Sequence, residues 1–209
     1  MGERLAIKMK KFTSKFYNNG YYEGNGSCYI GDYNWEDEKE ISRGYAKELK
    51  RIYNPKTVLD IGCAKGFLMR ALGELKIDAY GCDITNIDIG DKKKVCDVRD
   101  GLPYDKDSFD ICCSYSTFEH IDEHYINKLM KEVYRVARHG FYLEVPIGLK
   151  DYNDPIGDIS HVTYYTPSFW ISKAFRAGWL VDLRKSWHKT VVNCQNVHLA
   201  FFKKELSKY

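Results

Sequence analysis

The distribution of apolar residues divides most of the chain into short strands and amphipathic helices. Five runs rich in apolar or β-branched residues predict strands over 57–61, 78–83, 94–97, 109–114 and 141–145. Pro146 is expected to end the fifth strand, because proline lacks the N–H group that a strand uses for pairing. Two further apolar runs, 179–187 and 197–202, have no helical pattern between them, which predicts an antiparallel pair.

Helical spacing of apolar residues separates these strands. A helix is predicted over 36–53, before Asn54-Pro55. Its apolar face would consist of Ile41, Tyr45, Leu49 and Ile52. Another helix is expected over about 66–76, one follows the capping residue Asp122, and one begins at Pro167. Because strands and helices alternate from Thr57 onward, the sequence predicts a doubly wound α/β sheet with a terminal hairpin.

Composition and charge are those of an ordinary globular protein. The chain has 209 residues, of which 44% are hydrophobic and 29% charged, enough for one full core. A net charge of +3 is too small to indicate binding to nucleic acid or to an anionic membrane. No apolar run approaches a membrane span or the apolar region of a signal peptide. Seven cysteines without a CxxC motif suggest reduced thiols, so we expect a cytoplasmic protein.

The first 35 residues combine many aromatic residues with glycines. The glycines disfavour a helix, and the aromatic residues disfavour disorder. Two interpretations remain open: a lid that closes over a pocket, or an arm packed on the outside of the domain. The chain would then divide into this arm with its helix, over 1–54, and a ligand-binding domain over 55–209. The aromatic residues are Phe12, Phe16, Tyr17, Tyr21, Tyr22, Tyr29, Tyr33 and Trp35.

A glycine turn follows the first predicted strand. Gly62 and Gly66 would bring backbone N–H groups and a helix N-terminus to the carboxyl end of the sheet, where α/β folds bind ligands. The spacing of these glycines differs from the dinucleotide fingerprint G-x-G-x-x-G, and the nearby carboxylate of Asp60 repels phosphate. A cofactor with cationic sulfonium and ammonium groups fits this turn better than NAD.

Two further carboxylates end the next two predicted strands. Asp83 lies 17 residues after Gly66, where a nucleotide-binding fold places an acid beside the ribose hydroxyls. Asp97 ends the third strand, one position further out, near an adenine. Two acids at the expected places after a glycine turn favour a functional role over chance surface positions.

Together these segments resemble the class I S-adenosylmethionine-dependent methyltransferases of the type 11 group, over about residues 55–205. Ala64 departs from the pattern, since the family usually has glycine there, but a methyl group is a small change. The segments that carry the resemblance are Val58–Gly66, Asp83, Asp97–Asp110 and Ser114–Ile121.

The resemblance implies a Rossmann-like, seven-stranded sheet with an antiparallel last strand and S-adenosyl-L-methionine across the strand ends. It places the methionine part over the glycine turn, with Asp60 acting on the ammonium group directly or through water. It places the ribose and adenine edge at Asp83 and Ile84, and the adenine between Asp97 and Val98. The sulfonium would lie above Ser114 and Tyr115. The implied cofactor-binding residues are Asp60, Gly62, Cys63, Ala64, Gly66, Asp83, Ile84, Asp97, Val98, Ser114 and Tyr115.

Methyl transfer from a sulfonium is a direct displacement that releases a neutral thioether, so the enzyme mainly aligns the acceptor and excludes water. A general base is needed only when the acceptor must lose a proton, as a hydroxyl does. The catalytic candidates are His161, in the long segment 147–166, and Glu119 and His120 after the fourth strand. Structural roles remain open for all three: a loop anchor for His161, and a cap and packing pair for the others.

The same three residues match part of a metal-binding pattern, E-x-x-E-H with a later histidine, found in some small-RNA 3′-end and quinone methyltransferases. Ser116 stands where that pattern has its first glutamate, which removes a ligand. We therefore expect no metal.

The tyrosine-rich segment suits a small or sugar-like acceptor, because aromatic rings stack on rings and tyrosine hydroxyls form hydrogen bonds. We expect methylation of a small molecule or glycan precursor, on oxygen, and the low net charge disfavours a nucleic acid. Methylation of a peptide, a protein or a nucleic-acid end, or a non-catalytic subunit with the same fold, remains open. A nicotinamide-dependent oxidoreductase is opposed by the glycine spacing and by Asp60.

Overall fold

The computed structural model describes residues 12–17, 19–22, 33–87, 91–148, 158, 160–191 and 194–203. Tyr29, one of the aromatic residues of the predicted lid, lies outside these ranges. Within them, no helix is both long and apolar enough to cross a membrane.

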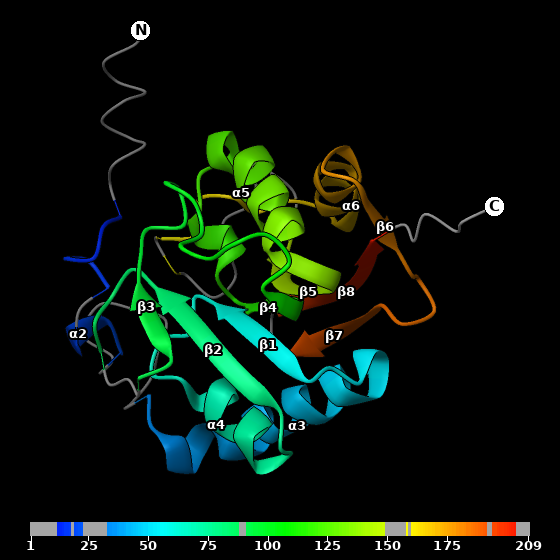
Figure 1. Ribbon diagram of the computed structural model, residues 1–209. Helices are drawn as coiled ribbons and strands as arrows, with labels where there is room; N and C mark the ends of the chain where they lie inside the picture. Colours follow the sequence, from blue (N-terminus) through cyan, green and yellow to red (C-terminus); the bar gives the residue numbers. More distant parts are fainter. Residues whose placement is uncertain are drawn as a thin grey trace, which may run out of the picture.

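A mixed β-sheet forms the centre of the structure (Figure 1). Seven strands lie side by side in the order β3-β2-β1-β4-β5-β8-β6, and β7 pairs with the other half of β8. The first five strands are parallel, and β8 is antiparallel to its neighbours. This arrangement confirms the predicted fold. The strands are β1 Thr57–Ile61, β2 Asp78–Asp83, β3 Lys93–Val95, β4 Phe109–Tyr115, β5 Ala137–Ile147, β6 Trp179–Val181, β7 Trp187–Val191 and β8 Cys194–Lys203.

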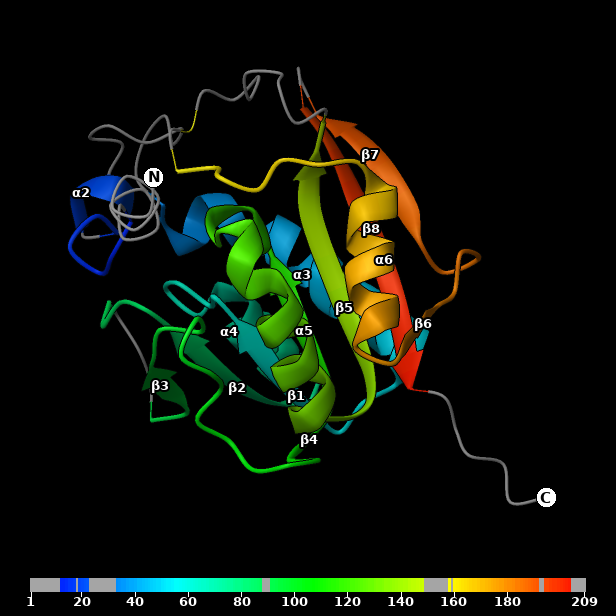
Figure 2. The ribbon, with the colours of Figure 1, turned by 90° about the horizontal axis from the view of Figure 1, so that it is seen from above.

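Helices cover both faces of the sheet (Figures 1 and 2). Alternate side chains of β1 enter two separate cores, because successive residues of a strand point to opposite faces. Val58 packs in the core beneath α3 and α4, and Leu59 packs in the core beneath α5 and α6. The helices are α3 Trp35–Tyr53, α4 Phe67–Glu74, α5 Glu123–Val136 and α6 Pro167–Arg176.

The position of Ile41 in α3 differs from the prediction. Ile41 was placed on the core face of this helix, but it is 52% exposed and lines a cavity described below. The buried face instead carries Ser42, Ala46, Leu49 and Ile52, and it is rotated slightly from the predicted face. The helix therefore has two roles, since one side packs on the sheet and an adjacent side faces the cavity.

Pro146 lies inside β5, where it pairs with Asn196 of β8, so the prediction that it ends the strand was wrong. The preceding strand β4 ends opposite Glu144, whose carbonyl accepts a hydrogen bond from the Ser116 N–H at 3.1 Å. In a strand, the backbone groups of residues two positions apart point toward the same neighbouring strand. The nitrogen of Pro146 therefore points toward β4, like the backbone groups of Glu144, but at a position beyond the last residue of β4. The missing N–H therefore removes no pairing bond.

Two other strand predictions required correction. The third strand runs over Lys93–Val95, so it ends two residues before Asp97. The apolar run 179–187 was predicted as one strand, but a turn divides it into β6 and the start of β7. At that turn the Asp182 carboxylate accepts a hydrogen bond from the Arg184 N–H at 3.1 Å, which favours the chain reversal.

We expect Gly62→Ala to destabilise the protein, whereas Gly44→Ala should stabilise it. Gly62 has φ +79° and a Cβ there would lie 2.1 Å from Thr117 Oγ1, while Gly44 is in the middle of α3 with no atom in the way. The expected changes in unfolding free energy are a loss of about 2 kcal/mol or more for Gly62→Ala and a gain of about 1 kcal/mol for Gly44→Ala. Urea denaturation measures both, and equal effects of the two substitutions would contradict the packing described here.

Candidate active site

A cavity of about 510 Å³ opens at the carboxyl ends of the parallel strands. Its volume is in the range of small-ligand sites. Its wall is formed by the glycine turn, the residues after β2 and β3, α3, β8, the segment after β4 and N-terminal aromatic residues. Of the predicted cofactor residues, the cavity wall contains Gly62, Ala64, Asp83, Ile84, Asp97, Val98 and Tyr115.

The glycine turn has a compact left-handed backbone. Gly62, Ala64 and Gly66 all have positive φ, at 79°, 43° and 76°. The N–H groups of Gly62 and Cys63 both donate to the Cys82 carbonyl, at 2.8 and 3.1 Å, so the turn is bound to the end of β2. Alanine adopts this conformation at Ala64 at a cost of about 1 kcal/mol.

Asp83 holds the turn and also faces the cavity. Its Oδ2 accepts the Ala64 N–H at 2.8 Å, and its Oδ1 accepts the N–H and the hydroxyl of Thr85, at 2.8 and 2.7 Å. A carboxylate offers about four acceptor positions, so the three donors leave room for a ligand hydroxyl. The carboxylate of Asp83 is therefore already oriented by the protein before a ligand binds.

Asp97 is engaged by its neighbour Arg99. The guanidinium forms a forked contact, with Nε at 2.8 and 2.9 Å from the two carboxylate oxygens. Burial tends to raise the pKa of Asp97, but the hydrogen bonds and charge of Arg99 outweigh it and lower this pKa. Asp97 is therefore an ionised, fixed group at the edge of the cavity.

Asp60 is buried beneath the turn, outside the cavity wall. Burial, together with the negative charge of Asp83, raises the pKa of Asp60 to about 7, and Lys93 partly opposes this rise. Three other predicted residues, Cys63, Gly66 and Ser114, are likewise outside the wall. The Ser114 hydroxyl donates to the Ile61 carbonyl at 3.0 Å, so it joins β4 to β1.

The segment after β4 takes part in a hydrogen-bonded group that the sequence analysis did not predict. Ser116, at φ 47°, donates from its N–H and its hydroxyl to Glu144 Oε2, both at 2.9 Å. Asn196 of β8 donates to the other oxygen of Glu144 and lines the cavity. Burial raises the pKa of Glu144 although these hydrogen bonds act in the opposite direction. A charged residue within the apolar run 141–145 was the one signal that could have revealed this group.

Aromatic residues of the N-terminal segment close the cavity on one side. Phe12, Tyr17, Tyr21 and Tyr22, of which the last two belong to the one-turn helix α2 (Asn19–Tyr22), form a buried cluster and line the cavity. Figure 1 shows α2 beside the strand ends. These residues therefore form part of the cavity wall.

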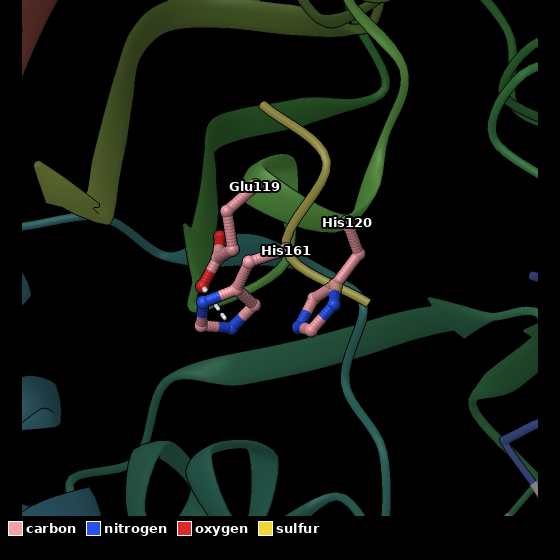
Figure 3. Close-up of side chains that lie close together, drawn as sticks. All are labelled: Glu119, His120 and His161. Carbon is pink, nitrogen blue, oxygen red and sulfur yellow. Dashed lines mark ion pairs between the residues drawn. The ribbon is translucent and has the colours of Figure 1, made fainter. Parts of the chain in front are cut away.

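Glu119, His120 and His161 come together beside the cavity (Figure 3). One ligand atom from each lies within 4.8 Å of the others, and His161 Nε2 is 4.0 Å from Glu119 Oε1. The N–H groups of Val162 and Thr163 both donate to the Glu119 carbonyl, at 2.9 Å, which holds the two segments together.

Only one of these three side chains, His120, lines the cavity. Burial and the neighbouring His161 lower the pKa of His120 to about 3, so its ring is neutral. Two imidazoles and a carboxylate also form a donor set that divalent metals accept. Ser116, at the position of the first glutamate in the metal-binding pattern, is turned toward Glu144 instead.

Comparisons with known proteins relate part of the sequence, and the fold, to methyltransferases. A family profile described as a methyltransferase domain matches residues 59–144, which run from β1 to Glu144 of β5. This part of the chain is therefore similar to a methyltransferase domain, and its strand order is that of the expected class I fold. The match supports S-adenosyl-L-methionine, the expected cofactor, for this site. No curated protein matches the sequence.

Several solved structures share the fold of this methyltransferase domain. One is a 1,6-didemethyltoxoflavin-N1-methyltransferase of Burkholderia thailandensis, solved with bound 1,6-didemethyltoxoflavin and S-adenosylhomocysteine. It is 13% identical in sequence, and the match covers 97% of this chain and 89% of that chain with a TM-score of 0.66. The [4+2]-cyclase SpnF is 13% identical over 91% of this chain and 96% of its own, with a TM-score of 0.65. A SAM-dependent methyltransferase of Archaeoglobus fulgidus is 17% identical over 82% of this chain and 100% of its own, with a TM-score of 0.59.

We predict that the affinity for S-adenosylhomocysteine falls as the pH decreases from 8 to 6. The Asp60 carboxyl, with a pKa of about 7, gains a proton over this range and would lose the attraction expected between it and the cofactor ammonium group. One linked proton weakens binding by at most tenfold per pH unit below the pKa. Titration calorimetry of the native protein and Asp60→Asn tests this. The variant should bind more weakly with little pH dependence, and an equal pH dependence in both proteins would contradict the role of Asp60.

Proposed function

We propose that this protein transfers the methyl group of S-adenosyl-L-methionine to a hydroxyl oxygen of a small-molecule or sugar-like acceptor. The observation that supports this proposal is the continuity of the cavity, which extends from the glycine turn and Asp83 to His120. The N-terminal tyrosines that line it, here called the aromatic cover, are Tyr17, Tyr21, Tyr22 and Tyr33. A single cavity of this kind lets the sulfonium and the acceptor meet away from water.

The cofactor would lie along the side of the cavity formed by the strand ends. Asp83 would accept hydrogen bonds from the ribose hydroxyls, with its carboxylate held in place by Ala64 and Thr85. The adenine would lie near Asp97 and Val98, and the methionine part over the glycine turn. Asp60, beneath that turn, would act on the ammonium group through its charge.

The acceptor would occupy the other side, between the aromatic cover and the segment after β4. Tyr45 and Tyr115 stack there with ring centroids 4.0 Å apart, and both line the cavity. Asn196 and His120 add polar atoms to the same space. This mixture of aromatic faces and a few polar groups is typical of sites for small organic ligands. The Burkholderia thailandensis N1-methyltransferase, which shares this fold, likewise binds a small organic molecule, 1,6-didemethyltoxoflavin.

His120 is the best-placed group to receive the acceptor proton, because His161 and Glu119 lie outside the cavity wall. The oxygen lone pair forms the new C–O bond while the electrons of the C–S bond return to sulfur. The resulting protonated ether is a far stronger acid than an imidazolium, so a weakly basic histidine suffices to take the proton.

Incubation with S-adenosylmethionine that carries a deuterated methyl group tests the proposal. The acceptor panel should contain phenols, monosaccharides and nucleosides, each with a matched amine, together with a peptide mixture and short RNA. We expect mass spectrometry to find the label on a small hydroxyl compound. Label confined to amines, peptides or RNA would contradict the proposed acceptor class.

Two tyrosines of the cover should separate acceptor binding from cofactor binding. Tyr17 packs against His120, with ring centroids 5.6 Å apart, whereas Tyr33 packs against Phe67 near the glycine turn, at 4.9 Å. Tyr17→Ala should raise the KM for the acceptor about tenfold, equivalent to about 1.4 kcal/mol of contact, with little change in the Kd of S-adenosylhomocysteine. Tyr33→Ala should weaken S-adenosylhomocysteine instead. The same effect from both variants would argue against two distinct subsites.

A further inference from the structure

A chain of hydrogen bonds leads from the N-terminal segment to His120 through a second carboxylate, Asp158. Tyr21 donates its hydroxyl proton to Asp158 Oδ2 at 2.9 Å. Ser160 donates from its N–H and its hydroxyl to Asp158 Oδ1, at 2.8 and 2.6 Å. The Ser160 oxygen also lies 2.8 Å from His120 Nδ1. Asp158 and Ser160 are both buried, so the chain is shielded from solvent.

The number of available protons determines the direction of these bonds. Three donors converge on Asp158, which is the pattern expected of an ionised carboxylate, an acceptor only. Ser160 has a single hydroxyl proton and uses it toward Asp158. Toward His120 the hydroxyl oxygen can therefore only accept, so the proton of the neutral His120 ring must be on Nδ1. Nε2, across the ring, is left with its lone pair.

We infer that Asp158 and Ser160 are positioning residues that hold His120 as the Nδ1–H tautomer, and that Tyr21 completes this arrangement when the N-terminal segment covers the cavity. Nothing in the sequence pattern had indicated a role for Asp158 or Ser160. The inference rests on the proposed function, because it describes how His120 is prepared to take the acceptor proton. His120 is the residue that meets the acceptor, and the other residues act through it.

In the reaction, the proton of the acceptor hydroxyl moves to Nε2 of His120 as the methyl group leaves sulfur for oxygen. The ring becomes an imidazolium with N–H groups at both nitrogens. Its Nδ1–H continues to donate to Ser160. The negative charge of Asp158, which is connected to the ring through the two hydrogen bonds of Ser160, stabilises the cation. The proton then returns to water when the product leaves. The carboxylate itself takes up no proton in this scheme.

Tyr21 connects this chain to the closed position of the cover. It belongs to α2, and its ring packs against Tyr17 and Tyr22 over the cavity, with centroids 5.0 and 5.1 Å away. Because the Tyr21 hydroxyl occupies one carboxylate oxygen, the other remains directed at Ser160. Closure over the acceptor and orientation of the base would thus occur together, which limits proton transfer to the covered site.

Nuclear magnetic resonance of protein with 15N-labelled histidine tests the inference directly. The long-range 1H–15N pattern distinguishes a protonated from an unprotonated ring nitrogen, and His120→Gln assigns the signal. With S-adenosylhomocysteine bound, we expect Nδ1 of His120 to be protonated and Nε2 unprotonated. In Ser160→Ala the population should shift toward the Nε2–H tautomer, and Ser160→Thr, which keeps the hydroxyl, should restore the native pattern.

Kinetics with the acceptor found by the deuterium assay provides the second measurement. Ser160→Ala should lower kcat about 10- to 100-fold, and Tyr21→Phe, which keeps the ring, about tenfold. The Kd of S-adenosylhomocysteine should change less than twofold in both, which also shows that the variants fold. An Nε2–H tautomer in the native protein, or an unchanged tautomer and kcat in Ser160→Ala, would overturn the inference. The native tautomer in a protein that methylates no hydroxyl would instead contradict only the proposed function.

Discussion

The close approach between the glycine turn after β1 and the segment after β4 determines the shape of the site. Thr117 occupies the space that a side chain at residue 62 would need, and this brings the two segments into contact. Asp83 fixes the same turn from the other direction through the Ala64 N–H. Both segments line a single cavity, in which the proposed cofactor and acceptor would meet.

Around this contact the protein buries several carboxylates, and each has a specific setting. Asp60 lies under the turn with an elevated pKa, Glu144 holds the strained Ser116, and Asp158 receives three donors. Burial of a charge is costly unless hydrogen bonds or opposite charges compensate it. Each carboxylate contacts or lies beneath residues of the cavity wall. In the proposed function, its cost in stability would be balanced by the orientation of ligands and of His120.

The sheet and its main helices could be predicted because strand and helix periods are local properties of the sequence. Most of the predicted cofactor residues lie in the cavity wall, because the glycine turn and the acids that follow β2 and β3 occur in a fixed order along the chain. Asp158, Ser160 and Asn196 could not be found this way, because their contacts join segments 40 or more residues apart. Pro146 and Ile41 were misplaced for a related reason, because both outcomes depend on packing. Pro146 is tolerated in β5 because the neighbouring strand β4 ends before it, and Ile41 is exposed because that side of α3 faces the cavity.

The central claim is that the strand-end cavity binds S-adenosyl-L-methionine through a carboxylate that the protein has already oriented. Titration calorimetry with S-adenosylhomocysteine, on the native protein, Asp83→Ala and Asp78→Ala, tests it most directly, with NAD as a control ligand. Asp78 lies at the opposite end of β2 and pairs with Lys92, so its loss should leave binding unchanged. We predict micromolar binding of S-adenosylhomocysteine alone, lost in Asp83→Ala and kept in Asp78→Ala. Binding of NAD instead, or binding that survives in Asp83→Ala, would contradict the account.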